Sequence, residues 1–380
     1  MIEFVSPEQY TQAVETYSKN SRLSLPLLQS PWWGHFKSHF GWTPLYCLVD
    51  ARPLLILARK LPVGGDIWYI PWGPAWLGAE TTSSSDVSKT MIELQVESSP
   101  RYFNDLQLLS DELLRAAEAC NAISNPVSLR FDIPVGVIEY VPDSSVHFAA
   151  DTPSSLRLPA ERVQVPTTVI LPLHRSFDAL LADMKKKTRY NIKLAQKKGV
   201  TVRKAGSDEL EKWYAMYRET AQRDAIAIHS LEYYQTFLQN SEQSDDGPAV
   251  MLLLAEHEGD LLAGIIIAMY DGVATYMYGA SYSLKRNLMP AYLLQAEAIQ
   301  IAQIHGCHSY DMLGIPATAD PSHPMHGLFR FKTGFGGTIV RRAGIVDRPA
   351  AVLKYSCVRL AGSVRRWYFN GVRKRLIRRQ

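Results

Sequence analysis

The sequence predicts a mixed α/β protein in which one unit of helices and strands occurs twice. Segments with helical spacing and segments with β-strand character follow the same order in both halves of the 380-residue chain. This length also exceeds that of one average domain, so two domains are expected. An apolar content of 47% and a charged content of 21% are ordinary for a globular protein with full-sized cores.

The first half is predicted to contain two helices, three strands, a third helix and a final strand. Turn residues separate the three strands, and Asn104 is expected to cap the third helix. The other elements are expected at Pro7–Lys19, Gln29–Phe40, Leu45–Val49, Leu54–Arg59, Ile67–Ile70 and Val127–Phe131.

The second half repeats this order after a segment, residues 141–168, whose Pro, Ser and Thr content predicts a linker. A strand at Val169–Leu173 is followed by a long helix from Ser176 to Gly199 and by another that Ser207 caps. The remaining elements are three antiparallel strands within Met251–Ser281, a buried helix from Pro290 to Gly306, and a strand at His308–Leu313.

This order is that of an N-acetyltransferase-like (GNAT) unit, so two tandem GNAT-like domains with mixed, largely antiparallel sheets are predicted. The expected bounds are 1–150, completed by 341–380, and 151–340, which contains the basic helix 176–198. Such units usually hold the coenzyme A pyrophosphate with a Gly-rich turn before the buried helix. The corresponding turn, Leu284–Pro290, has no glycine, so coenzyme A is not the expected donor.

Two segments are strongly basic although the net charge is only +4. Residues 185–199 contain seven Lys or Arg, and residues 354–380 contain nine, with no acidic residue in either segment. Such clusters suit a polyanionic partner, although a solvated basic face is the alternative. In the first segment, one helix face is predicted to carry Lys186, Arg189, Lys193 and Lys197.

The C-terminal segment combines its basic residues with apolar residues at helical spacing. These apolar residues are Leu353, Cys357, Leu360, Val364, Trp367 and Tyr368. A basic amphipathic helix binds an anionic membrane surface as readily as RNA. A solvated extension is the third interpretation.

Several residue patterns point to a cytoplasmic protein without a metal. The four cysteines are scattered, and the N-terminus lacks the basic and apolar regions of a signal peptide. No apolar stretch approaches the roughly 20 residues of a membrane-spanning helix. His323 and His326 lack an evident third metal ligand, so we expect them to shape a loop.

Eight short segments, spread in order over nearly the whole chain, carry a resemblance to a known family. They are Ser30–Lys37, Tyr69–Pro74, Leu129–Asp132, Lys187–Lys193, Thr220–Asp224, Tyr278–Ser281, Tyr310-Asp311 and Gly327–Gly337. Together they resemble the FemABX family, whose fold is two GNAT-like domains in one chain. The chain has no heptad run, so it is similar to compact members without a coiled-coil arm, and we expect a monomer.

The resemblance implies transfer of an amino acid from aminoacyl-tRNA to the stem peptide of a peptidoglycan precursor, either lipid II or UDP-MurNAc-pentapeptide. An acceptor amine attacks the ester carbonyl, so a proton must leave and an oxyanion must be stabilised. No coenzyme A, metal or other cofactor is needed. The alternatives are aminoacyl-tRNA-dependent transfer to a membrane lipid or protein N-terminus, and a non-catalytic module that binds tRNA or precursor.

The resemblance also places three candidate catalytic residues. Asp132, expected at a strand end facing a cleft between the domains, is the candidate base, although it could simply cap the turn before Pro134. Lys332 is the candidate for stabilising the oxyanion or a phosphate, although it could be a surface lysine next to a β-turn. Its neighbour Phe331 either contacts substrate or packs in the core. Glycines after Lys332, including Gly336, are expected to let substrate approach the backbone closely.

Four further residues are candidates for substrate binding. The resemblance assigns Lys37 and Arg223 to the diphosphate of the acceptor, although Arg223 could instead pair with Asp224 or Glu219. Tyr278 and Tyr310 are candidates for lining the peptide groove, with plain packing as the alternative. The basic stripe on the helix 176–198 is assigned to the tRNA acceptor stem, whose phosphates dominate affinity.

Overall fold

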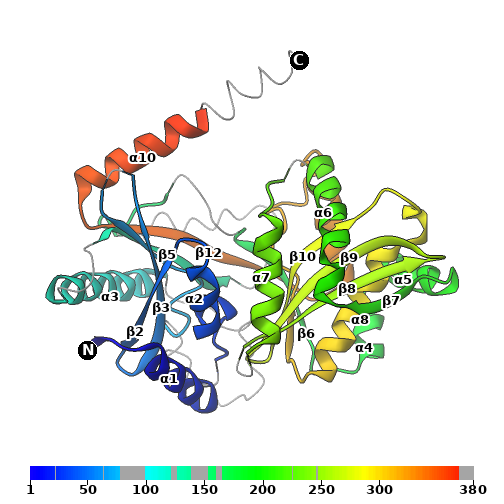
Figure 1. Cartoon of the computed structure of the whole chain (residues 1–380), viewed down its shortest axis with the longest axis horizontal. Coiled ribbons are helices and arrows are strands. Elements are labelled where there is room, and N and C mark those ends of the chain that lie inside the picture. The colour runs from blue at the N-terminus through cyan, green and yellow to red at the C-terminus, as the bar shows by residue number, and fades with distance from the viewer. Residues whose placement is uncertain are drawn as a thin grey trace.

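A computed structural model describes residues 1–21, 23–62, 64–77, 99–120, 126–137, 153–159, 165–224, 226–244 and 247–367. Within these residues, one sheet of 12 strands runs through both halves of the molecule (Figure 1). The strand order is β1-β2-β3-β4-β5-β12-β6-β11-β10-β9-β8-β7, so the two halves meet at the centre of the sheet.

In the first half, the described residues form five strands and three helices. In chain order these are β1 (Ile2–Phe4), α1 (Pro7–Asn20), α2 (Pro31–Ser38), β2 (Thr43–Val49), β3 (Arg52–Lys60), β4 (Asp66–Ile70), α3 (Ser99–Ala119) and β5 (Pro126–Val137). Ser6 and Ser30 start α1 and α2, because each hydroxyl accepts a backbone N–H three residues on.

The second half contributes the remaining strands and helices. They are β6 (Thr167–Pro172), α4 (Phe177–Asp183), α5 (Lys186–Lys197), β7 (Thr201–Ala205), α6 (Leu210–Asp224), α7 (Leu231–Glu242), β8 (Ala249–His257), β9 (Asp260–Tyr270), β10 (Val273–Ser281), α8 (Pro290–Ile304), β11 (Ser309–Asp311), α9 (His326–Lys332), β12 (Thr338–Pro349) and α10 (Val352–Trp367).

Each half contains the same succession of paired strands. Strands β2, β3 and β4 form an antiparallel meander, and after α3 the strand β5 pairs parallel to β4. Strands β8, β9 and β10 repeat the meander, and after α8 the strand β11 pairs parallel to β10. The predicted fold class, a mixed and largely antiparallel sheet flanked by helices, is therefore confirmed.

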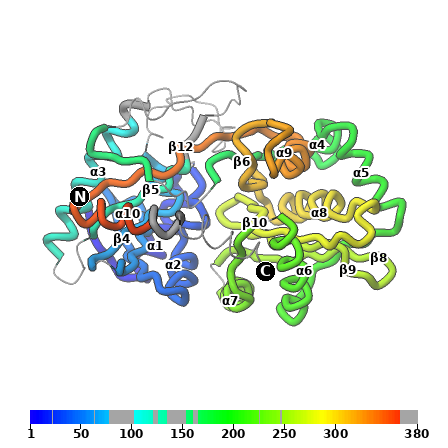
Figure 2. Tube along the Cα trace, turned by 90° about the horizontal axis from the view of Figure 1, so that it is seen from above, coloured from blue at the N-terminus to red at the C-terminus, as the bar shows by residue number. Residues whose placement is uncertain are grey.

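Strand β12 links the two halves, which lie side by side in Figure 2. Its residues Thr338–Arg341 pair with β6, and Arg341–Pro349 pair with β5. The domain bounds expected from the sequence stay a prediction.

The described side chains form three hydrophobic cores that flank the sheet. One lies under α3 in the first half, and another lies under α4, α5, α8 and α9 in the second half. The third is shared, because α1 and α2 of the first half pack near α6 and α7 of the second. The rings of Trp32 and Phe36 each lie 5.3 Å from that of Phe237, which joins α2 to α7.

The single helix predicted from Ser176 to Gly199 is wrong, because the chain forms α4 and α5 with a break between them. Met184 and Lys185 have extended backbone angles, with ψ of 150° and 142°. The Arg189 guanidinium donates to the carbonyl oxygens of Ala182, at 2.8 Å, and Met184, which satisfies the end of α4. The Ser176 cap itself is confirmed, since its hydroxyl accepts the Ala179 N–H.

Other element boundaries also differ from the prediction. Asn104 lies inside α3, which begins at Ser99, and Ser207 begins a short 3₁₀ turn ahead of α6. Of the predicted linker 141–168, only residues 153–159 and 165–168 are described. There Arg157 forms two backbone hydrogen bonds with Asp347 on β12, at 2.7 and 2.8 Å, so this part packs against the sheet.

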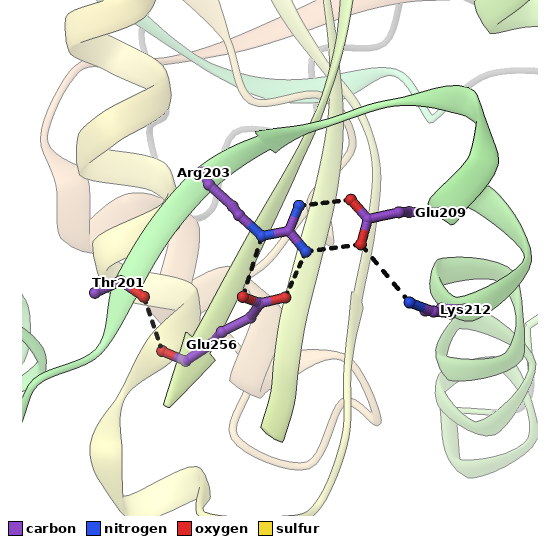
Figure 3. A network of polar contacts seen from close by, with 5 residues as sticks. All are labelled: Thr201, Arg203, Glu209, Lys212 and Glu256. Carbon is purple, nitrogen blue, oxygen red and sulfur yellow. Dashed lines mark hydrogen bonds and ion pairs between the residues drawn. The ribbon is translucent and has the colours of Figure 1, made fainter. Parts of the chain in front are cut away.

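An ion-pair network holds the edge strand β7 (Figure 3). The Arg203 guanidinium donates to Glu209 ahead of α6, at 2.5 and 2.7 Å, and to Glu256 on β8, at 2.6 and 3.1 Å. Lys212 reaches the same Glu209 carboxylate at 3.9 Å. Three elements are therefore tied together at the sheet edge.

Within the described ranges, none of the helices is both long and apolar enough to cross a lipid bilayer.

Candidate functional site

Asp132 lies in the middle of β5, in the buried centre of the sheet. Its neighbours Phe131 and Ile133 point into the core under α3, so alternation along the strand turns Asp132 to the opposite face. There the Tyr69 hydroxyl donates to Asp132 Oδ2 at 2.9 Å. Asp132 is 2% exposed, and burial raises the pKa of its carboxyl to about 6, against the opposing effects of Tyr69 and two arginines.

The expectation that Asp132 ends a strand is therefore wrong, and so is the alternative that it caps a turn. Strand β5 runs from Pro126 to Val137 because β4 pairs with one of its edges and β12 with the other. The Asp132 carbonyl accepts the Gly73 N–H at 3.2 Å, which ties the Tyr69–Pro74 segment to it.

A second buried carboxylate, Asp311, lies on the same face of the sheet. Tyr310 beside it packs in the core under α8, so alternation directs Asp311 to the opposite side. The Arg342 guanidinium donates to Asp311 Oδ2 at 2.6 Å, and the Thr168 hydroxyl donates to Oδ1. Arg342 also lies 4.8 Å from the Trp72 ring centroid, which places it near the first half.

Arg342 and Thr168 were missed by the sequence reasoning, and Asp311 was noted only as part of a motif. These residues meet because β12, β6 and β11 are neighbours in the sheet. The motif Tyr310-Asp311 was the available signal, since an acidic residue in a buried strand requires partners.

Lys332 ends α9 and is buried, with 6% of its surface exposed. Its ammonium donates to the carbonyl oxygens of Met312 at 2.6 Å, Gly314 at 3.1 Å and Leu313 at 3.3 Å. Its Nζ lies 5.1 Å from the Tyr276 ring centroid. Burial lowers the pKa of Lys332 to about 8, while the charge of Asp311 acts in the opposite direction.

The glycines after Lys332 approach the protein's own backbone and side chains. A Cβ on Gly334 would lie 2.4 Å from the Thr188 hydroxyl, and one on Gly337 would lie 2.5 Å from the Ile170 carbonyl oxygen. Gly336 and Gly337 have φ of 83° and 76°, a region that favours glycine. Gly334 and Gly337 therefore pack closely against α5 and β6, whereas a Cβ on Gly336 would lie 3.6 Å from its nearest neighbour, the Asp183 carbonyl oxygen. The expectation that substrate approaches the backbone at Gly336 stays a prediction.

Phe331 packs within an aromatic cluster beside Lys332. Its ring centroid lies 5.0 Å from that of Tyr292 on α8 and 5.3 Å from that of Phe335. The ring is half-buried against the second-half core. This placement fits the packing interpretation of Phe331.

Lys37, at the end of α2, is surrounded by aromatic rings. Its ammonium lies 5.3 to 5.9 Å from the ring centroids of Trp33, Phe36 and Tyr233. Burial, and then the nearby charge of Arg59, lower the pKa of Lys37 to about 8. The Arg59 guanidinium itself stacks over Trp42, with a distance of 5.3 Å to the ring centroid.

The other three substrate-binding candidates have protein partners. Arg223 pairs with Asp224 at 3.0 Å and donates to the Ser281 carbonyl oxygen at 2.9 Å, as the alternative interpretation expects. Tyr310 is fully buried and its hydroxyl donates to Gln295 on α8 at 2.9 Å. It therefore packs in the core, as the alternative interpretation expects, and does not line a groove. Tyr278 packs half-buried against Tyr234 and Phe237 of α7.

The four residues of the predicted basic stripe all lie on α5. Lys186, Lys193 and Lys197 are exposed, whereas Arg189 is half-buried and holds the end of α4. Of the predicted stripe, the three lysines are therefore accessible to a large partner, whereas Arg189 is engaged within the protein.

Helix α10 leaves much of its apolar surface uncovered. Leu353 and Leu360 are 84% and 68% exposed, and Cys357 between them is also exposed. The opposite side is anchored by Tyr355, whose hydroxyl donates to Asp347 at 2.9 Å. Residues 368–380, including Tyr368, lie outside the described residues.

A surface cavity of about 770 Å³ lies between α1, α2, β2 and the C-terminal end of α7. Trp32, His35 and Asn240 are among its lining residues, and none of the candidates named above lines it. Across the ranges that the structure describes, no group of three or more His, Cys, Asp or Glu is arranged to hold a metal ion.

Comparisons with known proteins agree with this architecture. The family model described as "FemAB family" matches residues 160–257 and 250–363. A lipid II:glycine glycyltransferase of Staphylococcus saprophyticus is 23% identical over 280 residues, which cover 55% of this chain and 68% of that protein. One from Staphylococcus haemolyticus is 20% identical over 251 residues, covering 50% of this chain and 60% of the relative.

A solved structure described as FemX shares the fold. It superposes with a TM-score of 0.72 at 18% sequence identity, covering 94% of this chain and 100% of that one. The superposition thus covers the whole length of the FemX chain. By contrast, this chain spans 68% of the S. saprophyticus protein and 60% of the S. haemolyticus protein.

Proposed function

Because the chain belongs to the FemAB family, we propose that it is an aminoacyltransferase that extends the stem peptide of a peptidoglycan precursor. The family match carries this proposal, and two of the buried ionisable residues near the junction of the halves, Asp132 and Lys332, support it. The relatives are named as acting on lipid II, so lipid II is the proposed acceptor and UDP-MurNAc-pentapeptide is its soluble counterpart.

Aminoacyl-tRNA is the proposed donor, and the reaction is aminolysis of its ester. The acceptor nitrogen bonds to the carbonyl carbon, the carbon–oxygen bond to the ribose breaks, and the ribose oxygen gains a proton. Asp132 is the proposed base that takes the proton of the amine. Its pKa of about 6 leaves the carboxylate mostly ionised at pH 7, while keeping it more basic than an exposed aspartate.

Lys332 is the proposed source of positive charge at the oxyanion. Its ammonium lies in a buried setting, where a charge acts more strongly than in water. A substrate oxyanion would replace one of its three carbonyl acceptors.

We assign the acceptor's diphosphate to Lys37, because its half-buried side chain has its ammonium beside aromatic rings and a second cation, Arg59, nearby. Arg223 is a weaker choice, since its guanidinium is already bonded to Asp224 and Ser281. The exposed lysines of α5 are assigned to the donor tRNA, whose phosphates they would neutralise. The proposed reaction needs neither coenzyme A nor a metal, and we place it in the cytoplasm.

We also propose that α10 rests on the anionic face of the cytoplasmic membrane. The exposed leucines of α10 favour a membrane over RNA as the partner of this helix. Leucine side chains gain binding free energy by leaving water for the lipid interface, and they gain none from contacts with phosphates. The chain from 354 to 380 has nine basic residues and no acidic one, which complements anionic lipid. A lipid-linked acceptor lies at the same surface.

Flotation with vesicles tests this contact. The full chain should bind vesicles containing phosphatidylglycerol, and Leu353→Glu with Leu360→Glu should reduce binding about tenfold or more. Leu284→Glu is the matched control, because Leu284 is also an exposed leucine (51%) but lies outside α10. This variant should bind the vesicles normally. Loss of tRNA affinity instead, with vesicle binding intact, would assign α10 to RNA.

Reconstitution tests the transfer reaction. The protein is incubated with a panel of radiolabelled aminoacyl-tRNAs and with lipid II, UDP-MurNAc-pentapeptide, membrane lipid or a peptide with a free N-terminus. Label should pass to a precursor, and Lys332→Ala should slow this by about 10²-fold or more. Label on the lipid or the N-terminus would favour those acceptors. Binding without transfer to any acceptor would favour the non-catalytic module.

A further inference from the structure

The ammonium of Lys332 is held by a turn of unusual shape that directly follows β11. Leu313 has a φ of 54°, in the left-handed region that non-glycine residues seldom adopt. With this backbone, the carbonyl oxygens of Met312, Leu313 and Gly314 all lie within 3.3 Å of Lys332 Nζ. The three N–H donors of the ammonium thus have three acceptors.

Asp311 holds this turn from the other side. Its Oδ1 accepts the Leu313 N–H at 2.8 Å, two residues along the chain, which is the hydrogen bond of an Asx turn. Thr168 on β6 and Arg342 on β12 donate to the same carboxylate, which is 4% exposed. Three elements therefore fix the carboxylate, and the carboxylate fixes the turn.

We propose that Asp311 is a positioning residue for Lys332, which it serves by holding the 312–314 carbonyl turn and by placing a negative charge beside that turn. This inference rests on the proposed function only for the catalytic use of Lys332. The placement of the ammonium through the turn that Asp311 holds rests on the hydrogen bonds described above and does not depend on the proposed reaction.

The electrostatic balance at Lys332 supports this role. Its side chain lies at the Tyr276 ring on β10 and at the carbonyl turn, with Asp311 and its partner Arg342 behind the turn. Lys185, bonded to Thr333 at 3.3 Å, adds a cation on the α5 side. Burial lowers the pKa of Lys332, and the negative charge of Asp311 raises it.

Two substitutions separate the parts of the mechanism. Asp311→Asn removes the charge but keeps an oxygen that can accept the Leu313 N–H. Asp311→Ala removes both, so the turn should also lose its shape. Asp347→Asn is the matched control, because Asp347 is a fully buried carboxylate bonded to Arg130 and makes no contact with Lys332.

The first measurement is the titration of Lys332 by ¹⁵N NMR of labelled lysine, assigned with Lys332→Arg. Asp311→Asn should lower the Lys332 pKa by about one unit, as expected when an opposite charge nearby is lost. Asp347→Asn should leave it unchanged. An unchanged Lys332 pKa in a folded Asp311→Asn protein would overturn the proposal. This readout needs no transferase activity, so it is independent of the proposed reaction.

The second measurement is the pH dependence of kcat for aminoacyl transfer. If the charged ammonium acts in the reaction, rates fall as pH rises through its pKa. This alkaline limb should then move down by about one pH unit in Asp311→Asn. A uniform loss of rate with no shift of the limb would mean that Asp311 is only structural. Lack of transfer by the unaltered protein would refute the proposed function and leave the titration result standing.

Discussion

At the scale of single residues, two of the buried carboxylates in the sheet, Asp311 and Asp132, differ in how well they are compensated. Asp311 accepts from an arginine, a threonine and a backbone N–H. Asp132 accepts a side-chain hydrogen bond from Tyr69, and burial raises its pKa to about 6. A poorly compensated carboxylate weakens the fold, and retaining one is typical of functional sites.

Replacement of Asp132 by asparagine should therefore separate stability from activity. The folded pKa lies above the value of 3.8 for the unfolded chain, so the folded state favours the protonated form. The stability that protonation gives is fully present below pH 3.8 and is lost as pH rises through about 6. At pH 7, Asp132→Asn should stabilise the protein by up to about 3 kcal/mol, measured by urea unfolding.

The same variant should lose transfer activity by about 10²- to 10⁴-fold, as expected for a missing base. In the unaltered protein, kcat/KM should fall below pH 6 as the carboxyl becomes protonated. Tyr69→Phe is the companion variant. It removes the hydrogen bond to the carboxylate, so the acidic limb should move to higher pH. A variant that is less stable at pH 7 yet fully active would contradict the assignment of Asp132.

Sequence reasoning found residues that stand in local motifs and missed those that meet only through the sheet. Lys332 and Asp132 were recognisable because each lies in a short characteristic segment. The pair of Arg342 and Asp311 was not recognisable, because 31 positions separate these residues and only the strand order brings them together. Tyr310 has a partner, Gln295 on α8, that a list of motifs does not reveal, whereas the pairing of Arg223 with Asp224 was among the alternatives.

At the scale of elements, the succession of most helices and strands along the chain was readable from hydrophobic periodicity, whereas β7, α7 and β12 were not predicted and breaks without Gly or Pro were not readable. The meander β8–β10 followed from its alternation and its two turns, at Gly259 and Gly272. The break between α4 and α5 lies at Met184-Lys185, where neither residue is a helix breaker. Tertiary contacts of the following segment decide it, since the Lys185 N–H donates to the Gly334 carbonyl at 2.9 Å.

The network at the edge strand β7 should contribute little to stability despite its many contacts. The Arg203 side chain is 41% exposed, so water screens its pairs with Glu209 and Glu256. We expect Arg203→Met to cost less than about 1 kcal/mol in urea unfolding at physiological salt. The pKa of Glu209 is held low by Arg203, and it should rise in the variant.

The control for this edge is the buried pair of Arg130 and Asp347, whose side chains are 19% and 0% exposed. Asp347→Ala leaves the Arg130 charge in a mostly buried place and should cost about 3 to 5 kcal/mol. Equal losses for the two variants would show that exposure does not govern these pairs.

At the scale of the whole molecule, β12 makes one folding unit of two similar halves. It pairs with β6 through Thr338–Arg341 and with β5 through Arg341–Pro349, and the shared aromatic core joins the halves again. We therefore expect the unaltered chain to unfold in one cooperative transition, although each half repeats the same unit.

Val340→Pro should uncouple the halves, because proline donates no hydrogen bond and Val340 pairs with Thr168 in the part of β12 that joins β6. Calorimetry should then resolve two transitions, or one broadened transition whose van't Hoff enthalpy is well below the calorimetric value. Val352→Pro is the control, because Val352 is the exposed first residue of α10 and proline fits the first turn of a helix. This variant should unfold in a single transition. If the Val340→Pro protein also unfolds in one sharp transition, the shared aromatic core alone couples the halves. Phe237→Ala in the Val340→Pro background should then divide the unfolding into two transitions.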